Sequence, residues 1–459
     1  MSLTKVTYSM INSSIFNVLD YGAVGDGVAD DTASVQAAIN AAVASVSAGG
    51  ATVYFPRGNY NCTNLTLANK SGLHLTGDAS TVYSCIKISG KITCNNTTDF
   101  RCNNLKFVGA NFNFTTDLFT GAPTAGNLLF EMVDSCANWS VHDCDFSGFA
   151  NVFQAQAGGA TGCYVIRIND NYFSSNLISF RLDVVLHWDI TGNTFAEDYE
   201  YNLYLTSGAE LRYSGNKHEN GINVMSGNNV YIDYTNQQVS DIIVTENSFH
   251  EFFGIAVNDA VRVTISNNTS RLQTSNFAVQ VNGVSESIVI NGNNFNGYTG
   301  SAYSDYGVSI SQTATFINVC GNNLINFERC VFCNVAQGSV LVSDNFLSAT
   351  VYAVEITNNT LDRRIVVQNN TATAPVKSTT NTNYWIEKLN RIINATPIDN
   401  TDGYMDQFYI EGSAAPTTGI WKVGDIVWNT APTAGGTIGF VCTTAGTPGT
   451  WKTWGAIAA

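Results

Sequence analysis

The sequence is poor in charged residues: Asp, Glu, Lys and Arg make up 12% of 459 residues, about half the share of an ordinary globular protein. Asn, Ser, Thr and Gly supply the polarity, which is typical of β-rich repeat proteins. Basic residues are especially scarce, with 21 Lys and Arg against 36 Asp and Glu and a net charge of −15. This balance argues against nucleic acid and anionic membranes as partners, but not against a neutral glycan or an acidic one in a locally basic groove.

Long apolar runs are also missing. No stretch of 18 apolar residues and no charged-then-apolar N-terminus occurs, so we expect no transmembrane span and no signal peptide. An extracellular role without a signal is typical of a virion protein released by lysis, and a trimmed leader would leave the same pattern. The 11 cysteines include one CxxC pair, Cys330 and Cys333, without a zinc-like ligand set. We expect reduced, buried cysteines, and no metal or other cofactor.

The first hundred residues contain the expected cap of the fold. Residues 1–15 are polar and unpatterned, like a linker, and a short strand follows at 16–22. Asp31 and Thr32 are N-cap residues for an Ala-rich helix over 33–44. An alternating strand over 51–55 comes next. We assign 16–99 to an N-terminal cap and the first coils.

The segment 100–375 repeats a strand, an Asn-x-apolar turn and a second strand, with a unit of about 22 residues. Regular turns begin at Asn171, Asn193, Asn247, Asn293, Asn322 and Asn359, and less regular ones at Asn104, Cys144, Asn216, Asn268, Asn345 and Asn370. One unit cannot bury its own apolar side, so the units stack as a coil of parallel strands. We predict that the aligned Asn side chains form a hydrogen-bonded ladder along the stack.

The strand after each Asn turn alternates aliphatic and polar residues, so the polar positions point outward. Aligned by sequence, the outward positions are Arg181, Tyr204, Asn223, Ala256, Gln280 and Ser309. Such a polar, partly aromatic face suits a glycan, although an ordinary solvated sheet has the same composition.

The pattern ends after residue 375. We assign 376–412 to a connecting segment and 413–459 to a small β module of short strands between Gly, Pro and Thr turns. Four of the chain's seven tryptophans lie in this module. So few residues bury four tryptophans poorly, which favours a role in association.

The segment from Phe16 to Gly27, followed by Asp30-Asp31-Thr32, the helix and Gly50 to Tyr60, resembles the N-terminal part of the pectate-lyase-like superfamily. That group includes polygalacturonases, related lyases and phage tailspikes. The resemblance implies an all-β fold, a right-handed parallel β-helix whose first helix covers the open end of the coil.

Residues 4–10 and the Trp-rich tail 443–451 look like phage tailspike sequences. The resemblance implies a homotrimer on a phage tail or baseplate, which acts outside the cell on a bacterial capsule, exopolysaccharide or O-antigen. The Gly-His-Gly and Arg-Ile-Lys motifs of polygalacturonases are absent, and Asn400-Thr401-Asp402 lies beyond the repeats. No catalytic residue is therefore transferred from that branch.

Charged side chains concentrate in three short loops. Glu200 and Glu219 precede what looks like the same strand position by two residues, so we expect them on adjacent coils about 4.8 Å apart. Two close carboxylates resist joint ionisation, so the pKa of one of them should rise. The protonated group can then protonate the glycosidic oxygen, while the ionised one acts as nucleophile or activates water. Glu197, Asp198 and Glu251 are the further catalytic candidates in that order.

The substrate-binding candidates come from the same coils and from one later loop. They are Arg181, Tyr204, Lys217, His218, Asn223, Tyr303 and Tyr306. Two other functions remain open. A lyase acting on a uronate polymer would take Lys217, His218 or a tyrosine as base and Arg181 as charge neutraliser, whereas a non-catalytic fibre would leave the glycan intact.

Overall fold

The computed structural model describes residues 15–45, 50–78, 84–156, 162–219, 227–233, 239–252, 254–272, 277–297, 304–335, 339–357, 365–378, 385–388, 391–392, 409–418, 421 and 423–459. The chain divides into two compact units, 1–243 and 244–459. The division falls within β26 (Val239–Thr245). Each unit is described by itself.

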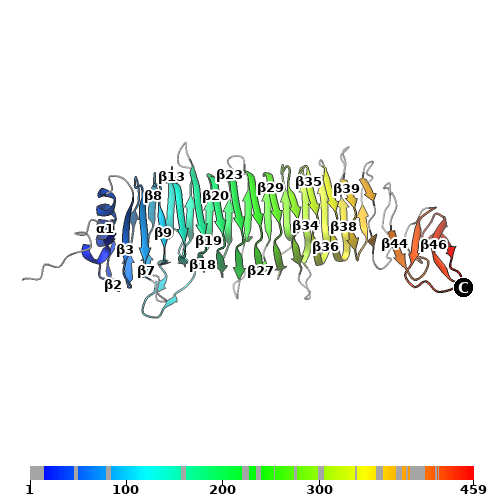
Figure 1. Ribbon diagram of the computed structural model, residues 1–459, viewed down its shortest axis with the longest axis horizontal. Coiled ribbons are helices and arrows are strands. Elements are labelled where there is room, and N and C mark those ends of the chain that lie inside the picture. Colours follow the sequence, from blue (N-terminus) through cyan, green and yellow to red (C-terminus); the bar gives the residue numbers. More distant parts are fainter. Residues whose placement is uncertain are drawn as a thin grey trace, which may run out of the picture. The chain divides into compact units, whose positions relative to one another are not determined.

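Unit 1 consists of three ladders of parallel strands that follow one another around each coil (Figure 1). Ladder one contains β1 (Ile15–Asn17), β3 (Ala51–Phe55), β6 (Leu73–Gly77), β9 (Arg101–Asn103), β14 (Ala137–His142), β17 (Cys163–Asn169), β20 (Val185–Thr191) and β23 (Gly208–Ser214). Ladder two contains β2 (Asp26–Asp30), β4 (Asn59–Cys62), β7 (Ser84–Ile88), β10 (Leu105–Val108), β15 (Asp145–Ser147), β18 (Tyr172–Ser174), β21 (Thr194–Ala196) and β24 (Lys217–Glu219). Ladder three contains β5 (Leu65–Thr66), β8 (Ile92–Asn95), β13 (Leu128–Asp134), β16 (Asn151–Ala155), β19 (Ile178–Leu182), β22 (Tyr201–Leu205) and β25 (Val230–Asp233). The expected parallel coil is confirmed.

Unit 2 repeats the arrangement. Its first ladder contains β29 (Val261–Ser266), β32 (Val289–Asn291), β35 (Ile317–Cys320), β37 (Val340–Ser343), β39 (Ile365–Gln368) and β42 (Trp385–Lys388). The other strands are β27 (Ser248–Phe252), β28 (Ile255–Asn258), β30 (Thr269–Leu272), β31 (Phe277–Asn282), β33 (Asn294–Asn296), β34 (Ser304–Gln312), β36 (Asn323–Val335), β38 (Phe346–Thr357), β40 (Thr371–Ala372), β41 (Val376–Ser378), β43 (Arg391–Ile392) and β44 (Tyr409–Gly412). β36 and β38 are long enough to serve the second and third ladders together.

The asparagine ladder is present in both units. In unit 1, the Nδ2 of Asn171 donates to Oδ1 of Asn193 and that of Asn193 to Asn216, each at 3.1 Å. In unit 2, five such bonds of 2.9–3.0 Å join Asn247, Asn268, Asn293, Asn322, Asn345 and Asn370. All these side chains are buried, so the ladder satisfies polar groups that a stack of turns would otherwise leave unpaired. Asn359 lies outside the described residues.

The helix α1 (Thr32–Ala44) packs against β1 and β3 at the start of the coil. It begins one residue before the expected bound. Asp31 occupies the N-cap, but its buried carboxylate accepts the backbone N–H groups of Val24 and Gly25 at 2.6 and 3.3 Å. The preceding Gly-rich turn is thereby held against the helix, so Asp31 joins two elements instead of capping one.

Stacked aromatic rings fill the interior of unit 1. The inward rings of Phe107, Phe146, Phe173 and Phe195 follow one another on ladder two, with successive centroids 4.9–5.7 Å apart. The 11 cysteines are free, and all except Cys320 are buried. They are core residues, as expected. The short antiparallel hairpin of β11 (Phe112–Asn113) and β12 (Leu118–Phe119) lies outside the ladders.

The C-terminal part is a separate antiparallel sheet of β45 (Ile426–Asn429), β46 (Thr437–Thr444) and β47 (Thr450–Ala456). Its four tryptophans form two edge-to-face pairs, Trp421 with Trp451 and Trp428 with Trp454, at 4.9 and 5.2 Å. The small β module is therefore confirmed. In the described part of the chain no helix combines the length and hydropathy that crossing a membrane requires.

Candidate functional site

The predicted site residues of unit 1 occupy three different places. The strand β24 separates three of them, because alternate residues point to opposite sides. Lys217 and Glu219 face solvent, whereas His218 is fully buried and continues the phenylalanine stack, 4.9 Å from the ring of Phe195. The expectation that His218 faces the substrate was wrong, since it occupies the inward position of its strand.

Asp198 is also inside the coil, which corrects its expected position on an outer loop. Its carboxylate accepts the N–H of Asn176, the hydroxyl of Ser179 and the amide of Asn202 at 3.1, 2.6 and 2.9 Å. Oδ1 of Asn202 in turn accepts Nδ1–H of His218 at 2.8 Å, and the hydroxyl of Tyr213 lies 3.1 Å from Nε2. These bonds form one buried polar network that holds neighbouring coils in register.

Burial shifts the pKa of both titratable groups in this network toward the neutral form. Desolvation raises the pKa of Asp198 to about 6, although the hydrogen bonds that it accepts oppose the shift. Desolvation lowers the pKa of His218 to about 3. Both side chains are fully buried, so neither reaches a polymer outside the coil.

The second place is the outer side of ladder two. Lys217 and Glu219 form an ion pair there, and the backbone N–H of Glu197 donates to the carbonyl of Glu219 at 3.2 Å. Glu219 therefore pairs with Ala196 on the adjacent coil, and Glu197 follows directly. Burial raises the pKa of nearby Tyr172, with smaller contributions from Asp145 and Glu197.

This register corrects the expected pairing of Glu200 with Glu219. The strand that matches β22 is β25, which starts at Val230, because the coil between them is longer than the sequence alignment assumed. Glu200 precedes β22 and lies at the edge of ladder three, while Glu219 ends a strand of ladder two. The two carboxylates do not occupy equivalent positions, and the catalytic role of each stays a prediction.

The third place is the outer side of β19, β22 and β25. Register aligns Arg181 with Tyr204 and Tyr204 with Tyr231 on successive coils. The rings of Tyr204 and Tyr231 stack at 5.1 Å, and the guanidinium of Arg181 lies 5.7 Å from the centre of the Tyr204 ring. Tyr201 packs edge-on against Tyr204 at 5.0 Å. Two of the expected binding residues are therefore brought together, with two tyrosines added.

Two carboxylates flank these rings. Asp183 and Asp233 share a column with Thr206 between them, so their backbones lie about 10 Å apart, two coil spacings. The hydroxyl of Thr206 donates to Asp183 at 2.6 Å and that of Tyr231 to Asp233 at 3.3 Å. Burial raises the pKa of Tyr231 to about 12, with a smaller contribution from Asp233. We call this surface the tyrosine face; it comprises Arg181, Asp183, Tyr201, Tyr204, Thr206, Tyr231 and Asp233.

The remaining candidates lie elsewhere. Asn223 and Tyr303 are outside the described residues, and of Glu251 only the backbone in β27 is described. Tyr306 belongs to unit 2, where its ring lies 4.9 Å from Phe332 and 5.7 Å from the guanidinium of Arg329. Tyr306 therefore lies in a cation–aromatic cluster, and its role in a sugar subsite stays a prediction.

That cluster in unit 2 contains a nearly buried carboxylate. Glu355 accepts the Nε of Arg329 at 2.5 Å, and Nζ of Lys377 lies 3.8 Å away. Lys377 also donates to the hydroxyl of Tyr352 at 3.0 Å. Because both cations have a partner in this network, the cluster is a rigid structural feature as well as a possible contact surface.

Sequence reasoning missed Tyr201, Tyr231, Asp183 and Asp233. The signal was present: Val230-Tyr231-Ile232-Asp233 alternates apolar and polar residues as Phe180 to Asp183 does. The long coil before residue 230 hid the match, because an alignment by Asn-turn spacing placed the strand at 221–225. Among the described residues no group of three His, Cys, Asp or Glu side chains is arranged to hold a metal ion.

Three parallel ladders, an internal asparagine ladder and a capping helix define a parallel β-solenoid protein. Residues 15–178 match the family model described as rhamnogalacturonase A/epimerase, pectate lyase-like. The resemblance expected from residues 16–60 is confirmed by this match.

Individual relatives share shorter segments. Mannuronan C5-epimerase AlgE2 of Azotobacter vinelandii is 50% identical over 68 residues, 14% of this chain and 6% of the relative. Plasmin and fibronectin-binding protein A of Streptococcus pneumoniae is 42% identical over 85 residues, 18% of this chain and 11% of the relative. The tailspike of Acinetobacter baumannii phage AM24 is 14% identical in structural superposition, which covers 72% of this chain and 53% of the tailspike with a TM-score of 0.47. The chain thus shares only a small part of the curated relatives' length.

Proposed function

We propose that the chain binds a bacterial surface polysaccharide along the tyrosine face and depolymerises it by glycoside hydrolysis. The observation that carries this proposal is the column of Arg181, Tyr204 and Tyr231 next to the carboxylates of Asp183 and Asp233. Aromatic rings stack on the apolar faces of sugars, and a carboxyl pair supplies the acid and base of hydrolysis. The polysaccharide-modifying activity named for AlgE2 supports a glycan as the substrate class.

The spacing of the two carboxylates favours an inverting reaction. Their backbones are about 10 Å apart, two coil spacings, which leaves room for the water molecule that an inverting glycosidase places between base and sugar. Arg181 is two residues before Asp183 and on the same outward side of β19, so its cation is next to this carboxylate. We therefore assign the general base to Asp183 and the general acid to Asp233.

A lyase is the second candidate, and the contact between Arg181 and Tyr204 favours it. In β-elimination an arginine neutralises the uronate carboxylate and a phenol removes the adjacent proton. His218 is unsuited to this role because it is buried and fully engaged. Lys217 is outside the coil but paired with Glu219, so a tyrosine is the better base.

The proposed setting is a phage tail that meets the bacterial surface, with the chain assembled as a homotrimer. The tailspike-like segments 4–10 and 443–451 support this setting. A non-catalytic adhesin remains the alternative from a different functional class, in line with the binding role named for the streptococcal relative.

Purified capsules, exopolysaccharides and O-antigens, incubated with the intact protein, test the proposal. Hydrolysis yields shorter chains with a new reducing end and no ultraviolet absorbance, whereas elimination yields chains whose new double bond absorbs. Proton NMR of early products gives the anomeric configuration, and inversion is expected. If the protein binds some of these polymers but shortens none of them, the depolymerase proposal is wrong and the protein is a non-catalytic adhesin.

A further inference from the structure

The outer side of ladder one in unit 1 gathers an unusual share of the chain's cationic groups. Arg101 aligns with Ser140, Ser140 with Arg167, Arg167 with Asp189 and Asp189 with Arg212. The three arginines therefore occupy every second coil of one outward column, about 10 Å apart. We call them the arginine column. Among these five aligned residues three are cationic and one, Asp189, is anionic, in a chain whose net charge is −15.

These arginines are exposed, and Asp189 lies in the column between Arg167 and Arg212. Within the described part of the chain, no ion pair involves Arg101, Arg167 or Arg212. Arg212 donates to the hydroxyl of Ser214 at 3.0 Å, which orients its guanidinium without neutralising it. Exposed guanidinium groups with open donor positions suit bidentate binding of carboxylates.

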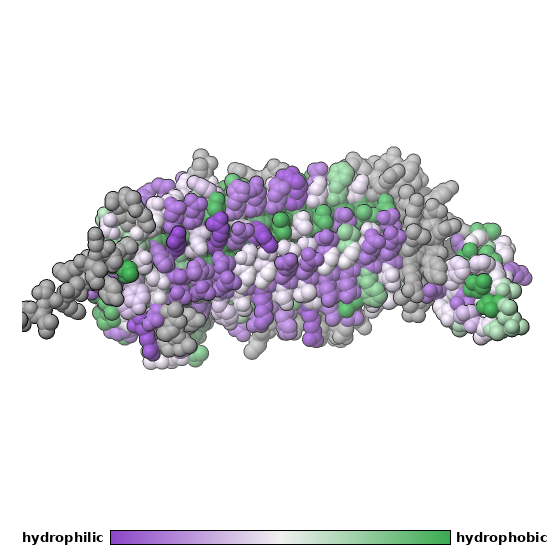
Figure 2. Space-filling model, viewed as in Figure 1, coloured by the Kyte–Doolittle hydropathy of each residue, from purple (hydrophilic) through white to green (hydrophobic). Residues whose placement is uncertain are grey.

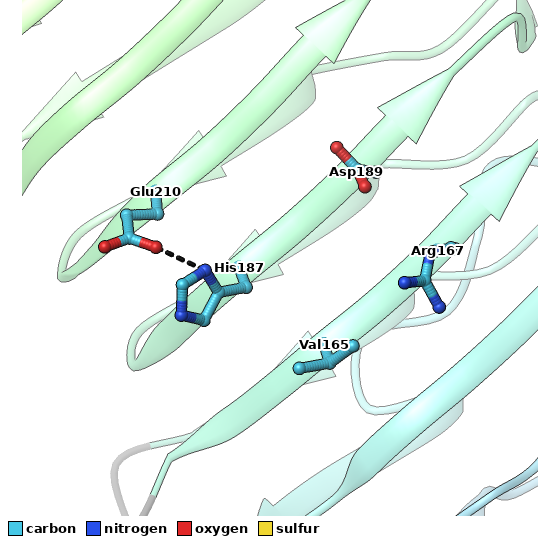
Figure 3. A pocket seen from close by; sticks show the side chains of 5 residues that line it. All are labelled: Val165, Arg167, His187, Asp189 and Glu210. Atoms are coloured by element: carbon cyan, nitrogen blue, oxygen red, sulfur yellow. Dashed lines mark ion pairs between the residues drawn. The ribbon is translucent and has the colours of Figure 1, made fainter.

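A pocket lies across three coils beside the arginine column (Figure 3). Val165, Arg167, His187, Asp189 and Glu210 line its volume of about 410 Å³. The imidazole of His187 contacts the carboxylate of Glu210 on the adjacent coil, which fixes the orientation of both side chains. The volume is in the usual range of small-molecule sites.

A strip of apolar surface runs next to the pocket. Tyr164 aligns with Leu186, and both side chains are about two-fifths exposed, at 41% and 42%. Val165, His187 and Glu210 all adopt φ between 55° and 58°, a backbone conformation that turns the chain outward next to this strip. A charged sugar has an apolar face and polar edges. An aromatic ring can contact the apolar face while neighbouring cations and hydrogen-bonding groups bind the polar edges.

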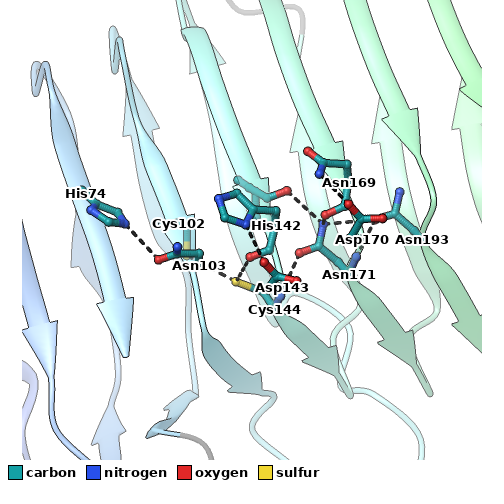
Figure 4. Close-up of polar contacts among 11 residues, drawn as sticks. His74, Cys102, Asn103, His142, Asp143, Cys144, Asn169, Asp170, Asn171 and Asn193 are labelled. Atoms are coloured by element: carbon teal, nitrogen blue, oxygen red, sulfur yellow. Dashed lines mark hydrogen bonds and ion pairs between the residues drawn. The ribbon is translucent and has the colours of Figure 1, made fainter. Parts of the chain in front are cut away.

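A column of polar residues, Asn103, His142 and Asn169, lies beside the arginine column. His74, which aligns with Arg101, lies 2.9 Å from Oδ1 of Asn103, and His142 lies 2.8 Å from the carboxylate of Asp143 (Figure 4). The amide of Asn169 donates to Asp170 at 2.9 Å. Hydrophilic residues make up most of the molecular surface coloured in Figure 2.

We propose that this face is a second polysaccharide-binding site, distinct from the tyrosine face, and that it holds a carboxylate-bearing glycan along the coil axis. The arginine column binds carboxylates at every second coil, and Tyr164 with Leu186 contacts sugar faces. A glycan with a carboxylate on every sugar, extended so that alternate sugars present theirs to the same side, has about the repeat that the arginines present. The inference rests on the proposed function for its ligand class, and adds a site that holds the polymer while the tyrosine face acts on it.

Binding measurements with mannuronan oligosaccharides test the site, and the same oligosaccharides with their carboxyl groups reduced serve as the matched neutral probe. The variant is Arg167→Gln/Arg212→Gln, and the control is Arg57→Gln/Lys452→Gln, which removes two exposed charges elsewhere. We expect the intact protein and the control to bind the acidic probe alike, more weakly as salt rises. The arginine variant should bind at least about tenfold more weakly, the loss of one or more charge-assisted hydrogen bonds.

Equal affinity of the arginine variant and the intact protein for the acidic probe would overturn the proposal, and so would equal binding of the reduced probe. A comparable loss in the control, or equally tight binding of duplex DNA, would mean general attraction of polyanions and would also overturn it. A change in molecular mass of the arginine variant would identify the face as a subunit interface instead. Product formation is measured separately, so arginine-dependent binding without cleavage supports this site while refuting the proposed depolymerase.

Discussion

The rings of Tyr204 and Tyr231 stack on adjacent coils with centroids 5.1 Å apart and planes 10° from parallel. The two residues are 27 positions apart in sequence, and only the stacking of coils makes them neighbours. Their shared surface, with Arg181 above one ring, is flat, aromatic and cationic at one end. This pair is the centre of the surface to which we assign glycan binding.

Replacing these rings separates stacking from hydroxyl chemistry. We expect Tyr204→Ala to weaken glycan binding roughly threefold to tenfold, in keeping with about 0.5–1.5 kcal/mol for one aromatic contact. Tyr204→Phe keeps the ring and should bind normally. If the reaction is elimination with Tyr204 as base, Tyr204→Phe instead abolishes turnover while binding stays intact. Calorimetric titration and product analysis on the same samples distinguish the two results.

The buried network predicts two opposing pH dependences of stability. The folded pKa of Asp198, about 6, exceeds its ordinary value of 3.8, so the folded state binds more protons and this group's stabilisation is lost as pH rises from about 4 to 6. The folded pKa of His218, about 3, is below its ordinary 6.5, so its stabilisation is lost as pH falls from about 6.5 to 3. Each slope is about 1.4 kcal/mol per pH unit, and the two offset each other between pH 4 and 6.

Single substitutions should remove this compensation. We expect Asp198→Asn to lose stability steeply as pH falls from 6.5 to 4, because only the pH dependence that His218 contributes remains. His218→Gln should gain stability over the same range. Urea unfolding at several pH values measures both slopes, whatever the absolute stability of each variant. Parallel pH profiles for the two variants and the intact protein would contradict the assignment of these buried groups.

The asparagine ladder predicts a large cost for one internal amide. Asn193 accepts the N–H of Asn171 and donates to the carbonyl of Ile168 and to Asn216, all in the interior. Asn193→Ala leaves these buried groups unpaired, and we expect a loss of about 3 kcal/mol in the free energy of unfolding. Asn169→Ala is the control, since the amide of Asn169 donates to the exposed carboxylate of Asp170, and its loss should cost no more than about 0.5 kcal/mol.

Assembly is testable with the C-terminal module. Trp421 and Trp451 pack edge to face within it, and Val423 and Ile438 are exposed apolar residues on its surface, at 67% and 38%. Such exposure in a small module favours burial against other copies. Light scattering should give a trimer mass for the full chain and a lower mass after deletion of 413–459. If the deleted protein is still a trimer, the module has no role in association. If the full chain is a monomer, the predicted trimer is wrong.

The sequence predicted the periodic parts of the fold and the general region of the site. The Asn-x-apolar turns carry their own register, because each amide must meet the next, so the ladder from Asn171 to Asn216 was readable from spacing. The segment between Glu219 and Val230 is longer than the repeat spacing predicts, and its extra length shifted the alignment of the residues that follow Glu219. Asp198 and His218 were misplaced for another reason: charged residues are seldom buried, and only the structure shows the partners that make burial tolerable.

The most direct test of the account is the rate at which new reducing ends appear in a polysaccharide that the intact protein shortens. Asp183→Asn and Asp233→Asn should each reduce this rate by about 10²–10⁴, the usual contribution of a general acid or base, and leave folding and binding unchanged. Asp117→Asn, an exposed carboxylate in a turn of the hairpin, is the matched control and should retain full activity. Near-normal rates for both Asp183→Asn and Asp233→Asn would contradict the claim that the tyrosine face is the site of cleavage.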